Sequence, residues 1–526
     1  MMNNGSMFFH IVIADFLERT RTYAYFITII VSLIVSFLFI PSSEAGYGTI
    51  VVSGYRGIYN SAWIGVSMAL SVSSFLSLVG FYLVKNTIDR DIQSGVGQII
   101  ASTPLKKSVY MFGKFISNFL VLLSIVFISF CMSIFMQWIR REDNKIIIED
   151  LFLPYLFVVI PVISVVASFA LLFESSSILR GKVGNVIYFF LWSLFLQVEF
   201  TLELGSVSIS SLLSNEIIYN AIKTQYQQLF PASMAKVEDG IVALNEPLNT
   251  FKWHGINWAI EIFTSRILWI LLSLFLIIIA SWVFKGFDDF KVKRKDWWER
   301  RRKKLEPINN WNHLTKMMLL SPIQIKYSFL YHIKSELTLL LNRQPIWWYI
   351  IASVFIVASL LAPMPITREY LSVMSWLWPL FIWSSMGIRE TRFHTSEIIF
   401  SSPSPVVRQI TAIWLAGVLI AMGTGIGYAG KLVIVGDMPG LAAWFIGSLY
   451  VPALALSLGI WTKTNKSFEL IYLSIIFIGL FNNIRLFDFL GIMDGSVESG
   501  IPIAYLLFTI VLLAGAYYGR YRHTQL

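Results

Sequence analysis

Residues 88–104 read IDRDIQSGVGQIIASTP, and residues 387–403, which lie 299 positions later, read GIRETRFHTSEIIFSSP. Each copy leaves one long apolar segment and leads into another. The residues that match at this single offset are Arg90 with Arg389, Asp91 with Glu390, Gln98 with Glu397, Ile99 with Ile398, Ile100 with Ile399, Ser102 with Ser401, Thr103 with Ser402 and Pro104 with Pro403. A duplicated polar element between apolar segments predicts two similar membrane halves fused head to tail.

The amino-acid composition indicates a polytopic membrane protein. Hydrophobic residues make up 56% of the chain, charged residues 14%, and the mean hydropathy is +0.68. A soluble domain is typically about 25% charged. Segments such as 23–40, 267–284 and 441–461 carry no charge, and they reach the roughly 18–20 residues that a helix needs to cross a bilayer.

The apolar segments predict an all-α fold with twelve membrane-spanning helices, six in each half. The predicted spans are 23–40, 62–84, 112–138, 153–174, 184–201, 266–284, 346–362, 371–388, 409–435, 441–461, 468–483 and 501–518. We therefore expect a first half at 1–290, a basic linker at 291–321 and a second half at 322–526.

Three further segments have a predicted role in this plan. The stretches 7–21 and 322–343 precede the first span of each half and mix apolar with polar residues. They predict amphipathic helices along the inner membrane surface, and the alternative is a helical extension of the span itself. The outer segment 202–265 also mixes both residue classes, so we expect it to fold as a cap.

The formal charge of +10 predicts contact with lipid and not with nucleic acid. The densest basic run, KVKRKDWWERRRKK at 291–304, directly follows a predicted span. Such a run orients a membrane protein and contacts anionic lipid head groups. The distribution of Lys and Arg places both termini in the cytoplasm, and we expect a plasma-membrane protein of a bacterial cell.

The apolar spacing within 88–104 predicts one short helix beneath the membrane. Its apolar residues, at positions 88, 92, 96, 99 and 100, share one helical face, and Pro104 ends the helix. We expect the apolar face to pack on the spans and the polar residues to meet a cytoplasmic partner. The predicted coupling residues are Asp89, Arg90, Asp91, Gln98, Pro104, Arg389, Glu390, Glu397 and Pro403. An ordinary amphipathic connector is the alternative, which the duplication disfavours.

Residues 89–114, DRDIQSGVGQIIASTPLKKSVYMFGK, resemble the membrane subunits of the ABC-2 exporter superfamily. The residues that carry the resemblance are Gly95 or Gly97, Ile99–Ile100, Thr103–Pro104, Lys106–Lys107 and Gly113–Lys114. The second half departs from this pattern, because His394 or Ser396 stands where glycine is usual and Ala412–Ile413 replace the Gly-Lys pair.

The resemblance implies six spans per half, an amphipathic helix before the first span and a coupling helix between the second and third. It also implies re-entrant outer helices before the sixth span. Such membrane subunits work in pairs over a cytoplasmic dimer of ATPase subunits, which bind ATP and Mg²⁺. By this resemblance the chain carries both membrane halves and no cofactor of its own.

The sequence predicts no catalytic or metal site in this chain. Residues 425–431, GIGYAGK, satisfy the phosphate-loop spacing, but Leu432 stands where a Ser or Thr would bind magnesium and the run lies in an apolar span. The glycines there suit close helix packing. Cys131 is the single cysteine and the six histidines are scattered, which argues against a disulfide framework or a metal cluster.

These observations predict the permease subunit of an exporter for an amphipathic substrate, such as a peptide antibiotic, a lipid or a drug. The candidate substrate-binding residues are Glu199 and Glu203, which are four positions apart and predicted to share a helical face at the outer membrane surface. The alternative is a major-facilitator-like secondary transporter driven by an ion gradient, which also has twelve spans in two repeats. The tight inner turn that is expected in such a transporter does not match the long polar connector of this chain.

Overall fold

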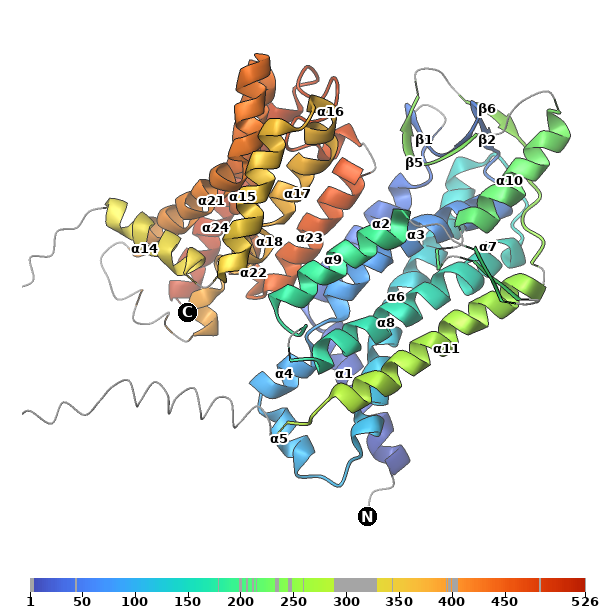
Figure 1. The fold of residues 1–526 in the computed structure, drawn as a ribbon, viewed down its shortest axis with the longest axis horizontal. Helices are drawn as coiled ribbons and strands as arrows, with labels where there is room; N and C mark the ends of the chain where they lie inside the picture. The colour runs from blue at the N-terminus through green and yellow to red at the C-terminus, as the bar shows by residue number, and fades with distance from the viewer. Residues whose placement is uncertain are drawn as a thin grey trace, which may run out of the picture.

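Two helical bundles that lie side by side form the protein (Figure 1). The structure is a computed structural model. It describes residues 4–287 and 329–525, except for residues 43–44, 178, 198–200, 205–206, 211, 214, 232–235, 245–247, 259, 343, 394, 396–398, 400–404 and 482–483. The predicted linker 291–321 lies outside the described residues.

The first bundle contains most of the helices before residue 288. They are α1 (Asn4–Thr20), α2 (Tyr23–Leu38), α3 (Ser61–Val84), α4 (Thr87–Gln93), α5 (Val96–Ala101), α6 (Lys107–Arg140), α7 (Ile148–Pro154), the π-helical turn η1 (Tyr155–Val159), α8 (Ile160–Ser175), α9 (Lys182–Gln197) and α11 (Ile260–Val283). The most buried of the long helices is α3, since 89% of its most apolar window is buried. A helix that is apolar on all sides belongs at the centre of a bundle.

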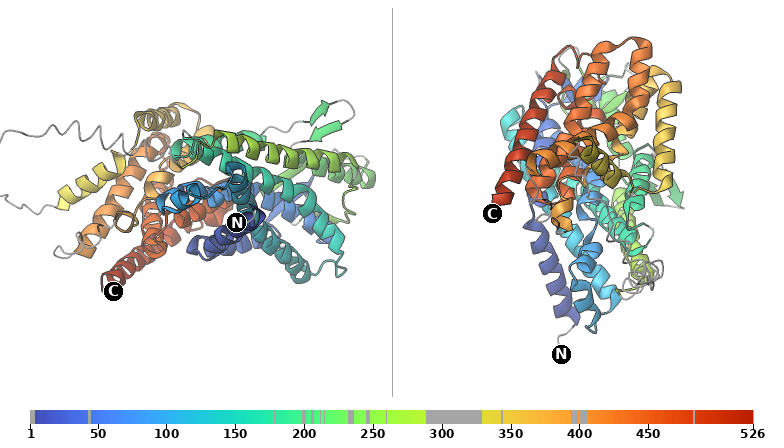
Figure 2. Two further views of the ribbon diagram at one scale, coloured as in Figure 1. Left: turned by 90° about the horizontal axis from the view of Figure 1, so that it is seen from below. Right: turned by 90° about the vertical axis from the view of Figure 1, so that its left-hand side faces the viewer.

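The second bundle contains the described helices after residue 328. Its elements are α14 (Phe329–Leu341), α15 (Ile346–Leu361), α16 (Met364–Ile366), the π-helical turn η3 (Thr367–Leu371), α17 (Ser372–Leu377), α18 (Leu380–Trp383), α19 (Arg389–Arg392), α21 (Pro405–Val435), α22 (Met438–Thr462), α23 (Asn465–Ile476), the π-helical turn η4 (Phe477–Phe481), the 3₁₀ turn η5 (Arg485–Phe487) and α24 (Ile501–Gln525). Each chain terminus lies at the lower end of its own bundle (Figures 1 and 2).

Helical structure occurs in all twelve segments that were predicted to span the membrane. Among the described residues, seven helices are long and apolar enough to cross a bilayer, and nine when each sharply bent pair counts as one span. The protein is therefore membrane-embedded and mostly helical, while the full number of twelve spans stays a prediction.

The amphipathic stretches form helices of their own. The α1 helix meets α2 at an angle of 71°, and α14 meets α15 at 103°. Bends of this size argue against simple extensions of the following spans. The α2 helix begins at Thr22, whose hydroxyl accepts a hydrogen bond from the Tyr25 N–H. This N-cap starts a new helix immediately after α1.

A small sheet lies at the end of the first bundle opposite α4 and α5 (Figure 1). Its strand order is β5-β1-β2-β6, with β1 (Tyr47–Val52) and β2 (Tyr55–Gly57) preceding α3, and β5 (Val237–Ala243) and β6 (Asn249–Phe251) following α9. Ser53 and Gly54, which join β1 to β2, both have positive φ, as a tight hairpin turn requires. The prediction of a fold without strands was therefore wrong at this end.

The predicted cap at 202–265 is folded wherever the structure describes it. It contains the antiparallel hairpin β3 (Thr201–Leu204) and β4 (Val207–Ser210), the helix α10 (Asn215–Leu229), and strands β5 and β6. Tyr226 of α10 packs its ring against Tyr55 and Phe251 of the sheet. The cap therefore combines residues from both ends of the first bundle's sequence.

An ion pair between Arg56 and Glu142 attaches the sheet to the end of α6. One guanidinium nitrogen lies 2.8 Å from the Glu142 carboxylate, and the Tyr59 N–H donates to the same carboxylate at 2.8 Å. Burial alone would raise the pKa of Glu142, but these hydrogen bonds and the positive charge of Arg56 hold the pKa below its ordinary value of 4.5. The ionised Glu142 carboxylate therefore stabilises the fold at pH values above 4.5.

We expect the Glu142→Gln variant to unfold more easily at neutral pH, by about 1 kcal/mol, because the partly exposed ion pair is lost. The difference should narrow as the pH falls below the ordinary pKa, where the wild-type carboxylate becomes protonated. Thermal unfolding of the purified protein at several pH values measures it. Glu238→Gln is the matched control, because Glu238 pairs with Lys236 on the exposed surface of the same sheet. An equal effect of both substitutions at neutral pH would contradict the anchoring role of Glu142.

Candidate functional site

The connector from α3 to α6 consists of two short helices. Asn86 has a left-handed conformation (φ 78°) before α4, and Gly95 has φ 79° between α4 and α5. Glycine adopts such a conformation without steric cost. The prediction of one continuous helix over 88–104 was therefore wrong, because the left-handed residue at Gly95 breaks it.

The break separates the apolar residues that were expected to share one face. Ile88 is fully buried, and Ile92 and Ile100 are partly buried. Val96 is 43% exposed and Ile99 is 67% exposed. The α5 helix therefore presents an apolar tip, which we define as Val96 and Ile99. Gln98 and Pro104 are exposed beside this tip.

Glu174, near the end of α8, holds the start of α4. Its fully buried carboxylate accepts hydrogen bonds from the backbone N–H groups of Asn86, Thr87 and Ile88, the last at 2.6 Å. The first N–H groups of a helix have no acceptor within the helix, and they carry partial positive charge. A carboxylate at this position accepts their hydrogen bonds and its negative charge is stabilised there. Glu174 is not among the coupling residues that the sequence predicts, because its partners in α4 lie about 86 residues earlier in the chain.

Asp15 of α1 joins the connector to α6. This carboxylate is 4% exposed, and it lies 2.6 Å from the Arg90 guanidinium and 2.9 Å from the Lys114 ammonium group. The Ser117 hydroxyl donates to it at 2.6 Å, and Arg19 lies one helical turn away at 3.2 Å. One acidic residue thus links α1, α4 and α6.

Asp91 occupies the other side of the same cluster. Its carboxylate accepts a hydrogen bond from the Tyr110 hydroxyl at 2.7 Å and lies 2.8 Å from the Lys114 ammonium group. Lys114 therefore lies between the carboxylates of Asp15 and Asp91. Asp91 is 6% exposed, and Asp89 pairs with Arg180 at 3.5 Å. The predicted coupling charges of the first copy thus make contacts within the chain. The expectation that they face outward was wrong for the buried Asp91, whereas the side chains of Asp89 and Arg90 remain about one-third exposed.

The second copy makes related contacts. Arg389 forms an ion pair with Glu336 of α14, the amphipathic helix that precedes this half. Glu390 is 3% exposed and accepts a hydrogen bond from Gln409 at 2.7 Å. Arg389 and Gln409 stand at the same 299-residue offset from Arg90 and Tyr110. The hydrogen bond that the acidic residue accepts from the residue 19 positions later therefore recurs at the same sequence register. The acidic partners of the two arginines, Asp15 and Glu336, do not correspond at this offset.

The cation beside Glu390 comes from a different helix than in the first half. Ile413 occupies the position that corresponds to Lys114. Arg520 of α24 lies 3.1 Å from Glu390 and so supplies the positive charge. Glu390 therefore has a cation although the second half lacks the Gly-Lys pair. Glu397 and Pro403 lie outside the described residues.

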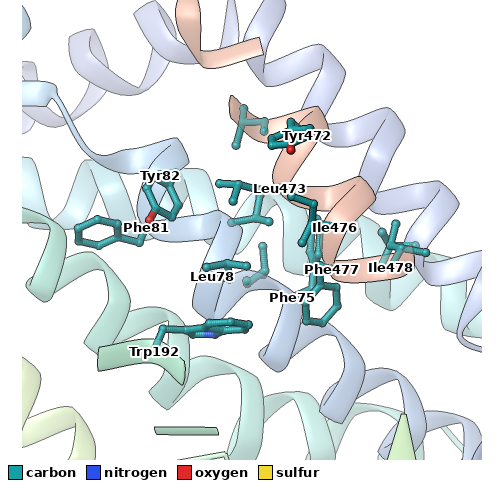
Figure 3. Packing of buried hydrophobic residues seen from close by; sticks show 14 of the residues in the cluster. Phe75, Leu78, Phe81, Tyr82, Trp192, Tyr472, Leu473, Ile476, Phe477 and Ile478 are labelled. Atoms are coloured by element: carbon teal, nitrogen blue, oxygen red, sulfur yellow. The ribbon is translucent and has the colours of Figure 1, made fainter. Parts of the chain in front are cut away.

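The two bundles meet through apolar side chains of α3 and α9 from the first and of α23 and η4 from the second (Figure 3). The ring of Phe477 lies 5.8 Å from that of Phe75 and 6.5 Å from that of Trp192. Near the connector, the Lys466 ammonium group of the second bundle donates to the Tyr82 carbonyl of the first at 2.7 Å. That carbonyl belongs to the last turn of α3, where carbonyl groups lack partners within the helix.

An apolar pocket lies between the two bundles beside this contact. Its lining includes Tyr82, Asn185 and Phe189 from the first bundle and Phe355, Trp378 and Phe381 from the second. The Tyr82 hydroxyl donates to the Asn185 carbonyl at 2.8 Å, and the Asn185 side chain accepts from Lys85. Both polar lining residues therefore have partners within the chain, and the pocket suits the apolar part of a ligand.

The proposed pair of acidic substrate contacts does not form one helical face. The α9 helix ends at Gln197, and Glu203 lies in strand β3. The sequence TLELGSVSIS at 201–210 alternates in polarity around a Gly-Ser pair, which is typical of a hairpin. This local preference overrides the helical spacing. Glu199 lies outside the described residues.

We expect Lys114→Met to destabilise the protein by about 3–5 kcal/mol, because the substitution leaves two buried carboxylates without their shared cation. Thermal unfolding in detergent is the measurement. Asp91→Asn in the same chain should recover part of the loss, because Lys114 is the cation of Asp91, whereas Asp15 keeps Arg19 and Arg90. Lys107→Met is the control, since Lys107 is exposed and donates to the Lys285 carbonyl. If Lys114→Met leaves the midpoint of thermal unfolding unchanged, the ion pairs of Lys114 with Asp15 and Asp91 do not stabilise the fold.

Comparison of the chain with protein-family models, with curated proteins and with solved structures finds no match in any of the three. The geometry of the connectors and of the pocket between the bundles is therefore the basis for assigning a function.

Proposed function

We propose that the chain is the membrane subunit of an ATP-driven exporter of the ABC-2 type, with two six-span halves in one polypeptide. The observation that carries the proposal is the repeated construction of the two connectors. In each copy the arginine pairs with an acidic residue of the preceding amphipathic helix, and the next residue is a buried acid. In each copy this acid also accepts a hydrogen bond from the residue 19 positions later.

The partner in this proposal is a dimer of ATPase subunits in the cytoplasm, which bind ATP and Mg²⁺. The first connector offers its apolar tip, Val96 and Ile99, for this contact, with Gln98 and Pro104 beside it. The charges transmit the motion and do not themselves bind the partner. Asp15, Asp91 and Glu174 tie the connector to α1, α6 and α8 through buried charged contacts. Because such contacts are costly to break, force on α5 moves these helices together.

The substrate in this proposal passes between the bundles and leaves the cytoplasm or the inner leaflet. The pocket there has mostly aromatic and aliphatic walls, including Phe189, Phe381 and Trp378. Such walls bind apolar groups through area burial and ring stacking. An amphipathic substrate fits, because its apolar part enters the pocket while its polar part stays at the membrane surface. Both termini and the connectors lie in the cytoplasm in this arrangement.

The coupling assignment predicts a specific effect of Ile99→Asp. Ile99 is 67% exposed, so the substitution should leave the fold intact. A buried carboxylate without a partner in the contact should weaken ATPase binding at least about tenfold. The measurement is the amount of ATP-hydrolysing subunit that co-purifies with the chain from its native membrane in mild detergent.

Leu486→Asp is the matched control for this experiment. Leu486 is 65% exposed in η5 and belongs to the segment that is expected on the outer surface. It should retain the ATPase subunit as the wild-type chain does. A chain that purifies alone, and whose transport follows an ion gradient without ATP, would support the secondary transporter instead.

A further inference from the structure

Two tryptophans of the second bundle direct their indole nitrogens at one glycine. Trp376 comes from α17, Trp444 from α22, and Gly425 from α21, on which both other helices pack (Figure 1). A Cβ atom added to Gly425 would lie 2.8 Å from the Trp444 Nε1 and 3.2 Å from the Trp376 Nε1. The two nitrogens are therefore at most 6.0 Å apart, the sum of these two distances.

Neither of these indole N–H groups has a hydrogen-bond acceptor among the residues that the structure describes. Trp376 is 1% exposed and Trp444 is 5% exposed, so bulk water does not satisfy them. A buried donor without a partner is unfavourable, and buried tryptophan N–H groups usually find a partner. The neighbouring Trp383 follows this rule, because its N–H donates to the Gly417 carbonyl at 3.2 Å.

The geometry around Gly425 allows one oxygen atom to serve both donors. N–H···O hydrogen bonds span about 2.7–3.2 Å between heavy atoms, so an oxygen between two nitrogens that are at most 6.0 Å apart can accept from each. The carbonyl groups in the interior of α21 are used by the helix itself. A side chain on residue 425 would press against both indoles, and glycine avoids this contact.

We propose that Trp376, Trp444 and Gly425 form a buried binding site for one neutral oxygen acceptor. That oxygen belongs to a water molecule or to the carbonyl or hydroxyl group of a ligand. A charged ligand does not fit, because two neutral donors cannot offset the cost of burying a full charge. The bound oxygen joins α17 to α22 across the face of α21. The site does not depend on the transport proposal.

The test replaces each indole N–H without changing the shape of the side chain. Site-specific replacement of Trp376 or Trp444 by 3-benzothienylalanine puts sulfur in place of the N–H group. If an oxygen is bound, each replacement lowers the midpoint of thermal unfolding by at least about 1–2 °C. The double replacement should cost less than the sum of the single ones, because both donors share one acceptor. Replacement of Trp383 is the positive control, and replacement of Trp282, which is 81% exposed, is the neutral one.

Two arms of the experiment distinguish the sources of the oxygen. If the losses persist after the protein is stripped of lipid in detergent, the acceptor is water. If they vanish on stripping and return when vesicles of native lipid extract are added, the acceptor belongs to a lipid or another membrane-soluble ligand. Either result supports the site. Unchanged or raised midpoints for both tryptophans, with the expected loss at Trp383, would overturn it.

Discussion

The shared ion pairs of Lys114 set the arrangement of the first bundle's connector end. An isolated charge is strongly unfavourable in a medium of low polarity, so the burial of Asp15, Asp91 and Lys114 depends on their being buried together. These residues come from α1, α4 and α6. The positions of three helices are thereby fixed by one electrostatic requirement. The second bundle satisfies the same requirement around Glu390 with Arg520, a cation from its last helix.

The hydropathy of the sequence predicts much of the helical framework. It does not predict the contacts at the connector end and at the sheet end of the first bundle. Helices formed in every apolar segment because a membrane leaves the backbone few other ways to satisfy its hydrogen bonds. The break at Gly95 overrode an apolar spacing that a continuous helix would also satisfy. The direction of Arg90 and Asp91 was not predictable from that spacing, since their partners Asp15 and Lys114 lie far away in the sequence. For the same reason, strands β1 and β2 were missed, because they pair with segments about 190 residues later.

The departure of the second half from the family pattern shows how a buried acid constrains substitution. Ile413 cannot neutralise Glu390, and a reading of α21 alone would leave that carboxylate unpaired. The Arg520 guanidinium reaches Glu390 from α24, and it also donates to the Gly387 carbonyl at 3.2 Å. The two connectors therefore keep the same electrostatic balance with cations from different helices. A weak sequence match can thus accompany a well-satisfied site.

The two ends of the first bundle and the contact between the bundles are held by different forces. Ion pairs hold the connector and the sheet, buried at the connector and partly exposed at the sheet, whereas aromatic rings such as Phe75 and Phe477 fill the contact between the bundles. Breaking a buried ion pair exposes uncompensated charge, but separating apolar surfaces that lipid can replace costs far less in a membrane. The Lys466 ammonium group can also exchange the Tyr82 carbonyl for Glu469, which lies 3.3 Å away. Relative motion should therefore occur between the bundles, beside the pocket, while each connector moves as one body with its helices.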